Sequence, residues 1–225
     1  MFLTDFRHEC KIEIARSDLP LLRTRLSAVA KRDPHAQDGR YSVRSLYFDT
    51  PDDDALFQKI NGTNRREKFR LRCYNGDTSV IRLEKKSKID GLCNKQTAEL
   101  TAEEVRRLLD GDTDWMLSHP HPLVRELYAK YQTRLLRPRT IVDYTREPFV
   151  YPYGNVRVTF DYDIRTGLHS TDFLDPGSLT VPAGNTVLME VKWDAFLPDV
   201  IRRLTELPGR HAGAFSKYAQ CRVFD

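Results

Sequence analysis

The stretch Arg66–Lys86, REKFRLRCYNGDTSVIRLEKK, contains two runs in which apolar and charged residues alternate. The runs flank Asn75-Gly76-Asp77, a strong signal for a β-hairpin turn. Side chains in a strand repeat every two residues, so each run has one charged face. On the charged faces lie Arg66, Lys68, Arg70, Arg72, Arg82, Glu84 and Lys86. For the two basic faces to coincide, each residue must pair with one whose number is even when its own is even and odd when its own is odd. This favours a loop of three or five residues over one of two residues.

Length and composition indicate an ordinary soluble protein. The chain has 225 residues, 30% of them charged and 40% hydrophobic, a length that allows one large domain or two small ones. No shift in composition marks a boundary, so we predict one domain over residues 1–225. The formal net charge is only +4, so an anion site must arise from where the charges are placed. The four cysteines have no CxxC spacing, which suits a reduced, cytoplasmic protein. Signal-peptide and membrane-spanning patterns are absent from the sequence.

The alternation of the hairpin recurs along the chain. Six predicted strands place ionisable residues two apart; they begin at Phe6, Arg66, Val80, Arg139, Val156 and Thr186. One charged strand face is usually just solvated. Here the opposite strand faces are apolar and need cover, and amphipathic helices such as Asp18–Lys31 and Leu123–Leu136 need an apolar partner. Helices outside and charges inside satisfy both needs, so we predict an α+β fold in which an antiparallel β-barrel carries helices on its outside.

The pooled charged faces predict a phosphate ligand. They hold more cations than carboxylates, and a buried basic excess requires an anionic partner. Arg and Lys are the usual partners of phosphate, and carboxylates in a phosphate site commonly hold Mg²⁺ or Mn²⁺. Nucleic acid fits less well because the aromatic residues, including Tyr47 and Tyr144, are expected in the core.

Several segments between these strands have simpler expectations. Ser87–Asn94 is expected to be a Lys-rich loop that turns at Asp90-Gly91, with Lys88 solvated. Beyond Val156–Asp161, the segment Ile164–His169 is expected to form a further short strand.

Nine short motifs, in order along the chain, carry a resemblance to a known family. They are Arg7-His8-Glu9-x-Lys11, Ser45–Thr50, Lys68-x-Arg70-x-Arg72-x-Tyr74, Leu83-Glu84-x-Lys86, Asp90-Gly91 to Lys95, Pro138-Arg139 to Tyr144-x-Arg146, Val156–Thr159 with Asp161, Met189–Lys192 and Phe215–Tyr218. In these the chain resembles the VTC-type polyphosphate polymerase domain, a branch of the triphosphate tunnel metalloenzymes with a CYTH-like fold. The resemblance implies an eight-stranded antiparallel tunnel.

The resemblance also implies a chemistry. Such domains bind ATP with Mn²⁺ or Mg²⁺ and transfer its γ-phosphoryl group to a growing inorganic polyphosphate chain. The acceptor phosphate is already ionised, so no general base is needed. By position, the implied phosphate-binding residues are Lys11, Arg70, Arg72, Lys86, Lys95, Arg139, Arg157, Lys192 and Lys217. Glu190 is the implied metal ligand, with Glu9 as a second candidate.

Two other functions remain open. Tunnel triphosphatases and nucleotidyl cyclases typically carry Glu-x-Glu-x-Lys on the first strand, whereas this chain has Glu9-x-Lys11-x-Glu13, which favours the polymerase branch. The other alternative is a non-catalytic sensor that binds polyphosphate or inositol phosphates. Export of a polymer across a membrane would need a membrane-protein partner, because this sequence has no membrane segment.

Overall fold

The fold is one curled antiparallel sheet, seen in a computed structural model that describes residues 7–36, 38–89 and 92–224. Eight strands follow one another across the sheet in the order β1-β10-β8-β7-β3-β4-β5-β6. Their bounds are β1 His8–Ile14, β10 Val187–Trp193, β8 Val156–Thr166, β7 Arg137–Tyr151, β3 Tyr41–Asp49, β4 Arg66–Tyr74, β5 Asp77–Ile89 and β6 Leu92–Leu100. Two short strands extend it, β2 (Lys31–Arg32) beside β7 and β9 (Val181–Pro182) beside β8.

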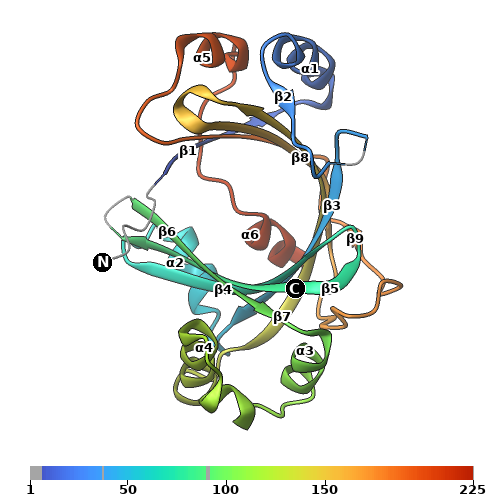
Figure 1. Cartoon of the computed structure of the whole chain (residues 1–225), viewed down its shortest axis with the longest axis vertical. Helices are drawn as coiled ribbons and strands as arrows, with labels where there is room; N and C mark the ends of the chain where they lie inside the picture. Colours follow the sequence, from blue (N-terminus) through green and yellow to red (C-terminus); the bar gives the residue numbers. More distant parts are fainter. Residues whose placement is uncertain (1–6, 37, 90–91, 225) are drawn as a thin grey trace.

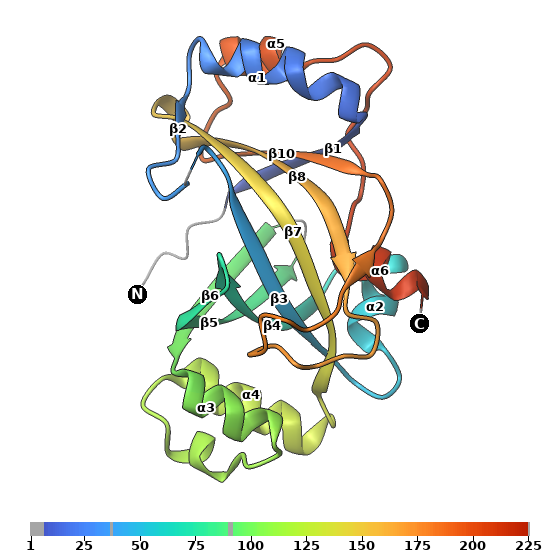
Figure 2. The same cartoon turned by 90° about the vertical axis from the view of Figure 1, so that its right-hand side faces the viewer.

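The predicted α+β class and the eight antiparallel strands with helices outside are confirmed, but the barrel is open. Among the described residues the edge strands β1 and β6 are not hydrogen-bonded to each other, so the sheet is a half-barrel. Figure 1 shows its concave side, with α1 (Leu19–Ser27) and α5 (Asp199–Thr205) at one end and α3 (Ala102–Leu109) and α4 (Pro122–Thr133) at the other. Figure 2 shows the same layers from the side.

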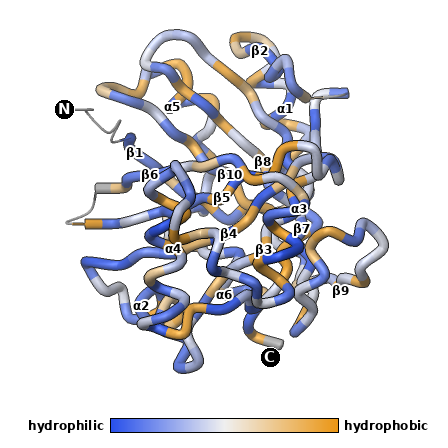
Figure 3. The backbone as a smooth tube through the Cα atoms, turned by 60° about the horizontal axis from the view of Figure 1, so that its bottom comes forward, coloured by the Kyte–Doolittle hydropathy of each residue, from blue (hydrophilic) through white to orange (hydrophobic). Residues whose placement is uncertain are grey.

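The convex side of the sheet carries two hydrophobic cores. Phe69, Leu71 and Leu83 of the central hairpin pack with Val105 of α3 and Leu127 of α4. A second core joins the apolar faces of β1, β8 and β10 to α1 and α5. Along the strands hydrophilic and hydrophobic residues alternate, as Figure 3 shows. Burial of the apolar faces therefore leaves the charged faces of the strands on the concave side.

Two further helices border the concave side. α2 (Asp54–Ile60) packs against β4, and α6 (Lys217–Cys221) follows near the end of the chain. Tyr218 of α6 is buried against Tyr47 of β3, with ring centroids 5.0 Å apart. α6 therefore lies against the concave wall of the sheet, where Figure 1 draws it. No helix in the described part of the chain is long and apolar enough to cross a membrane.

The central hairpin confirms the expected parity but not the expected loop. Arg70 lies opposite Glu84 and Arg72 opposite Arg82, so both charged faces coincide. The turn itself has two residues, Asn75 and Gly76, both with positive φ. A register shift between Arg72 and Tyr74 corrects the parity. A β-bulge thus does what a longer loop was expected to do.

Other element boundaries differ from expectation. The segment expected to be a loop, Ser87–Asn94, continues β5 and begins β6, while its turn at Asp90-Gly91 lies outside the described residues. The two short strands expected after Val156 form one strand, β8. The first helix ends at Ser27 rather than Lys31, because Lys31 pairs with Val150 in the sheet. In each case tertiary pairing extends or ends an element beyond its local pattern.

Candidate functional site

The concave side of the sheet encloses a strongly cationic cavity of about 660 Å³. Among the described residues, twelve Lys and Arg side chains line it, against four Asp and Glu side chains. The cations are Arg7, Lys11, Lys68, Arg70, Arg72, Arg82, Lys86, Lys95, Arg146, Arg157, Lys192 and Lys217. The carboxylates are Glu9, Asp33, Glu84 and Glu190. This excess of positive charge in a partly enclosed space is an anion-binding environment.

Glu84 organises the wall formed by β4, β5 and β6. Its side chain is 1% exposed and accepts a hydrogen bond of 2.8 Å from Arg70 Nε, with Arg72 and Lys95 also within ion-pair distance. Burial alone would raise the pKa of Glu84, but the positive charges of Arg70, Arg72 and Lys95 outweigh burial and hold the pKa well below its usual range. Glu84 is therefore ionised at neutral pH and holds these cations in place.

Asp161 organises the facing wall, where β7, β8 and α6 meet. Arg146 donates two hydrogen bonds to the Asp161 carboxylate, at 2.6 and 2.7 Å, and Lys217 Nζ lies 2.7 Å from it. Asp161 itself is fully buried, while both of its cationic partners line the cavity. A bidentate Arg–carboxylate pair fixes the plane of the guanidinium. Asp161 thus orients Arg146 and Lys217 toward the space between the walls.

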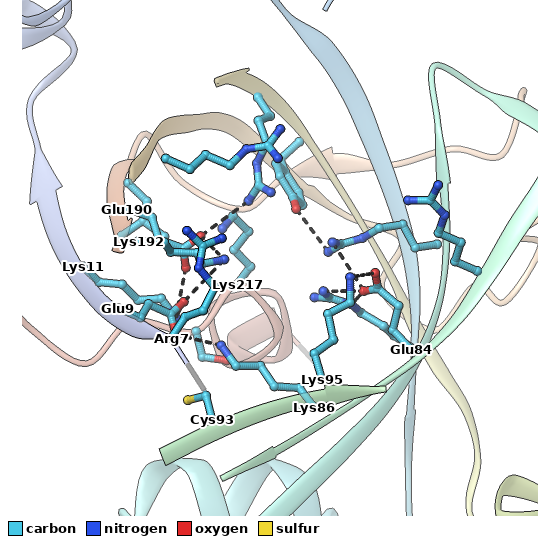
Figure 4. A pocket seen from close by; sticks show the side chains of 18 of the residues that line it. Arg7, Glu9, Lys11, Glu84, Lys86, Cys93, Lys95, Glu190, Lys192 and Lys217 are labelled. Atoms are coloured by element: carbon cyan, nitrogen blue, oxygen red, sulfur yellow. Dashed lines mark hydrogen bonds and ion pairs between the residues drawn. The ribbon is translucent and has the colours of Figure 1, made fainter. Parts of the chain in front are cut away.

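Glu9 and Glu190 form a third group, shown in Figure 4, that differs in its partners. Lys11 Nζ lies 3.2 Å from Glu9 and 3.5 Å from Glu190, and Lys192 Nζ lies 3.0 Å from Glu190. Burial alone would raise the pKa of Glu190; Lys192 and Lys11 outweigh it and keep the pKa well below its usual range. The closest cations are lysines, whose point charges hold a carboxylate less rigidly than an arginine fork does.

The Glu9–Glu190 group is where a divalent cation fits best. Glu9 Oε1 is buried and, among the described residues, has ion-pair neighbours but no hydrogen-bond donor of suitable geometry. The described part of the chain holds no cluster of three or more His, Cys, Asp or Glu that could bind a metal on its own. Mg²⁺ and Mn²⁺ are commonly bound by one or two carboxylates together with phosphate oxygens of a ligand. The residues therefore fit a cation that is shared with a phosphate.

Two tyrosines and a lysine complete the cavity. Tyr47 and Tyr144 are buried, as expected, but their hydroxyls accept hydrogen bonds from Arg70 (2.9 Å) and Arg72 (3.2 Å) inside the cavity. Burial would raise the pKa of Tyr47, yet Arg70, Lys68 and Arg72 lower it to about 7. Burial lowers the pKa of Lys68 to about 7; nearby Tyr47 opposes this shift, and Arg70 adds to it. Both groups therefore titrate near neutral pH.

The structure brings ten of the eleven expected site residues into this cavity. They are Lys11, Arg70, Arg72, Lys86, Lys95, Arg157, Lys192, Lys217, Glu9 and Glu190. Lys217 is not a surface lysine: its side chain is 11% exposed and bound to Asp161. Arg139 is the exception, because it is not among the lining residues and lies 3.5 Å from Asp53.

Side chains of even-numbered and odd-numbered residues of β7 lie on opposite faces of the sheet, which explains why Arg139 lies outside the cavity lining. The same alternation identifies Arg146 as a lining residue that was not among the expected ones. Tyr144 and Arg146 line the cavity, whereas Asp143, which has the same parity as Arg139, binds Arg44 outside it. The register between β7 and β3 also shifts beside Arg139, and a bulge re-aims the side chains near it. The signal for Arg146 was its two-residue spacing from Tyr144.

Comparisons with known proteins agree with this geometry. A sequence profile of the VTC domain family matches residues 6–224. Among solved structures, a putative adenylyl cyclase from Hippeastrum, HpAC1, described as having a dominant triphosphatase activity, is similar with a TM-score of 0.57 and 16% identity, covering 97% of this chain and 96% of its own. The PH1819 protein from Pyrococcus horikoshii OT3 is similar with a TM-score of 0.51 and 13% identity, covering 95% and 96%.

The two structural similarities concern the fold alone, because the identities are low. No curated protein sequence matches the chain significantly. The family match, in contrast, spans nearly the whole chain and includes every strand of the cationic cavity. This chain belongs to the VTC domain family.

Proposed function

We propose that this chain is a polyphosphate polymerase, a phosphotransferase that moves the γ-phosphoryl group of ATP onto inorganic polyphosphate. The observation that carries the proposal is the composition of the cavity, whose lining, as far as the chain is described, has twelve cations and four carboxylates around about 660 Å³. A triphosphate and the end of a polyphosphate chain are the class of ligand that such an excess of charge favours. The family of the chain makes this ligand class the natural first choice.

The cations would act by alignment and charge neutralisation. Phosphoryl transfer needs little covalent help from the protein; it needs the donor and acceptor in line and the equatorial oxygens neutralised. Arg70 and Arg72 are held by Glu84 on one wall, and Arg146 and Lys217 by Asp161 on the other. Because these side chains are ordered before a ligand arrives, binding costs less reorganisation.

A divalent cation would be held by Glu190 and Glu9. Mg²⁺ or Mn²⁺ supplies further charge neutralisation of the phosphate oxygens when bound. Lys11 and Lys192, which now pair with these two carboxylates, would then be available to the phosphates of the ligand. The terminal phosphate of the acceptor is ionised at neutral pH, so the transfer needs no general base from the chain.

The experiment that tests the proposal follows the product. Purified protein is incubated with γ-labelled ATP and Mn²⁺ or Mg²⁺, with and without a short polyphosphate primer, and the products are separated on a gel. A ladder of polymer is expected from the wild type and from Glu13→Gln, a control on β1 whose exposed side chain lies outside the cavity lining. The ladder should be lost in Glu190→Gln and in Arg70→Ala/Arg72→Ala.

Two other results would replace the proposal. Release of orthophosphate without polymer would make the chain a triphosphatase, the activity described for the structurally similar Hippeastrum protein. Binding of polyphosphate without any turnover would make it a sensor. If the polymerase is confirmed, we propose that one domain over residues 1–225 carries the activity and that a separate membrane protein exports the polymer.

A further inference from the structure

The end of the β4–β5 hairpin that lies away from its turn pairs like charges with like charges. Arg66 lies directly opposite Lys88, and Lys68 directly opposite Lys86. Lys86 in turn lies opposite Lys95 of β6. Like charges directly across two strands are destabilising, whereas the next pair along the hairpin, Arg70 and Glu84, is of opposite charge. A further like-charge pair, Arg72 and Arg82, lies toward the turn, but at the end away from the turn two such pairs follow each other and a third cation, Lys95, adjoins them.

A cation from another element joins this end of the hairpin. Lys59 lies in the last turn of α2, which packs against β4. Burial lowers the pKa of Lys59, and the positive charges of Arg66, Lys11 and Lys88 lower it further, so Lys59 lies within electrostatic range of these cations. We refer to Lys59, Arg66, Lys68 and Lys88, from α2, β4 and β5, as the basic cluster.

Among the residues that the structure describes, the basic cluster has no carboxylate partner. Over the described ranges 7–36, 38–89 and 92–224, none of its four side chains forms an ion pair with a carboxylate. On the opposite face of the same two strands the situation is different: Lys85 pairs with Glu67 and Glu126, and Glu67 also binds Lys130. Within the described part of the chain, the four cations of the basic cluster therefore differ from the rest of the inner face, where carboxylates such as Glu84 and Glu9 pair with the cations.

The other end of the cavity is different in character. β4 runs from Arg66 to Tyr74, so its two ends lie at opposite ends of the cavity. At the Tyr74 end, Tyr41 and Tyr74 meet edge to face with ring centroids 5.5 Å apart. Arg157 there is paired with Asp33. Aromatic rings and a compensated cation favour a nucleoside over a bare polyanion.

We infer that the basic cluster extends the phosphate-binding site out of the cavity and binds the polyphosphate chain, which enters and leaves at the α2 end. Three members, Lys59, Arg66 and Lys88, lie outside the cavity lining, and Lys68 connects them to it. Alternate residues from Arg66 to Arg72 place cations along about 20 Å of strand, since a strand rises about 3.4 Å per residue. The inference rests on the proposed function for the identity of the polymer.

The test compares a short and a long ligand. Binding of tripolyphosphate and of long-chain polyphosphate is measured by calorimetry at several salt concentrations, for the wild type and for Lys59→Ala/Arg66→Ala/Lys88→Ala. The triple variant should bind the long chain about tenfold or more weakly, with a smaller salt dependence, because each cation facing a polyanion releases counterions. Its affinity for tripolyphosphate should stay within about twofold, because the cavity lining is unchanged.

A control variant removes the same net charge elsewhere. Lys31→Ala/Arg106→Ala/Arg203→Ala replaces three exposed cations outside the cavity lining and should leave both affinities within about twofold. The inference is wrong if the cluster variant binds both ligands normally, or if it loses affinity for the two ligands equally. Failure of the proposed function shows differently: wild-type protein that turns over ATP without making polymer would refute the polymerase, while the length comparison still decides the role of the cluster.

Discussion

Lys86 on β5 donates a hydrogen bond of 2.7 Å to Glu9 on β1, and so joins two strands from opposite sides of the open sheet. Among the described residues no backbone ladder connects β1 to β6, so side chains bridge the half-barrel here. Each of these side chains is also a candidate ligand, Lys86 for phosphate and Glu9 for a metal. A bound phosphate would compete with Glu9 for Lys86, which links ligand binding to the gap between the sheet edges.

Replacement of Lys86 should affect binding far more than stability. In Lys86→Met the ion pair with Glu9 is lost, but a partly exposed pair contributes only about 1 kcal/mol or less to the free energy of unfolding. The affinity for tripolyphosphate, measured by calorimetry, should fall about tenfold because a charge-assisted contact is removed. Lys85→Met is the matched control, since Lys85 faces outward to Glu126. Equal losses of affinity in the two variants would contradict a specific role for Lys86.

Replacement of Asp161 should destabilise the protein in a way that a ligand can repair. Asp161→Asn leaves Arg146 and Lys217 buried without their carboxylate, which should cost about 3 kcal/mol in urea unfolding. Tripolyphosphate should recover part of this loss by supplying negative charge to the same cations. Glu147→Gln provides the comparison: Glu147 is a buried carboxylate bound by Arg23 outside the cavity, so its loss should not be repaired.

Asp161 should also make stability depend on pH at the acid end. Arg146 and Lys217 outweigh the effect of burial and lower the pKa of Asp161 below its usual value. A carboxyl group with a lowered pKa contributes stability above its unfolded pKa of about 4, and this contribution is lost as pH falls below that value. The free energy of unfolding in urea should therefore fall between about pH 5 and about pH 3 in the wild type. The fall should be smaller in Asp161→Asn, which lacks this carboxyl group.

Anion affinity should decrease as pH rises through neutrality. The pKa values of Lys68 and Tyr47 are both about 7, so above that pH the cavity loses one positive charge and gains one negative charge. Lys68→Arg/Tyr47→Phe should bind tripolyphosphate with a flatter pH profile, because arginine stays protonated and phenylalanine does not ionise. Ionisation of the ligand affects both proteins equally. Parallel profiles between about pH 6 and pH 9 would contradict this assignment.

Whereas anion affinity should fall as pH rises, the titration of Lys68 should make the folded protein more stable as pH rises. The pKa of Lys68 in the folded chain, about 7, is below the value of about 10.4 in an unfolded chain. Between these values the unfolded chain binds more protons, so the contribution of Lys68 makes the free energy of unfolding rise with pH. Ligand-free Lys68→Met should lack this part of the rise in urea unfolding, and the wild type at the same pH values is the reference.

Two arginines of β7 should behave differently. Arg146→Ala removes a cation of the cavity lining and should lower tripolyphosphate affinity by about tenfold or more. Arg139→Ala removes a side chain that lies beside Asp53, so the affinity should stay within about twofold. The same calorimetric measurement distinguishes them. If Arg139→Ala binds as weakly as Arg146→Ala, the position that the family resemblance assigns to Arg139 is the correct one.

The local pattern predicted the strands well because it depends on covalent geometry. Alternation along Arg66–Arg72 identified both a strand and its charged face. The loop of the central hairpin was mispredicted because a register shift between Arg72 and Tyr74 depends on pairing with the partner strand. Bulges of this kind leave little trace in the sequence.

By itself the sequence determined that this protein has an antiparallel sheet with one apolar and one basic face, because side-chain direction in a strand follows from position alone. Tertiary structure decided which carboxylate holds which cation. Glu84 meets Lys95 from the next strand, Asp161 meets Lys217 from a helix 56 positions later in the numbering, and Glu9 meets Lys86 across the open side of the sheet. These partners depend on strand order and register, which arise from burial of the apolar faces as a whole.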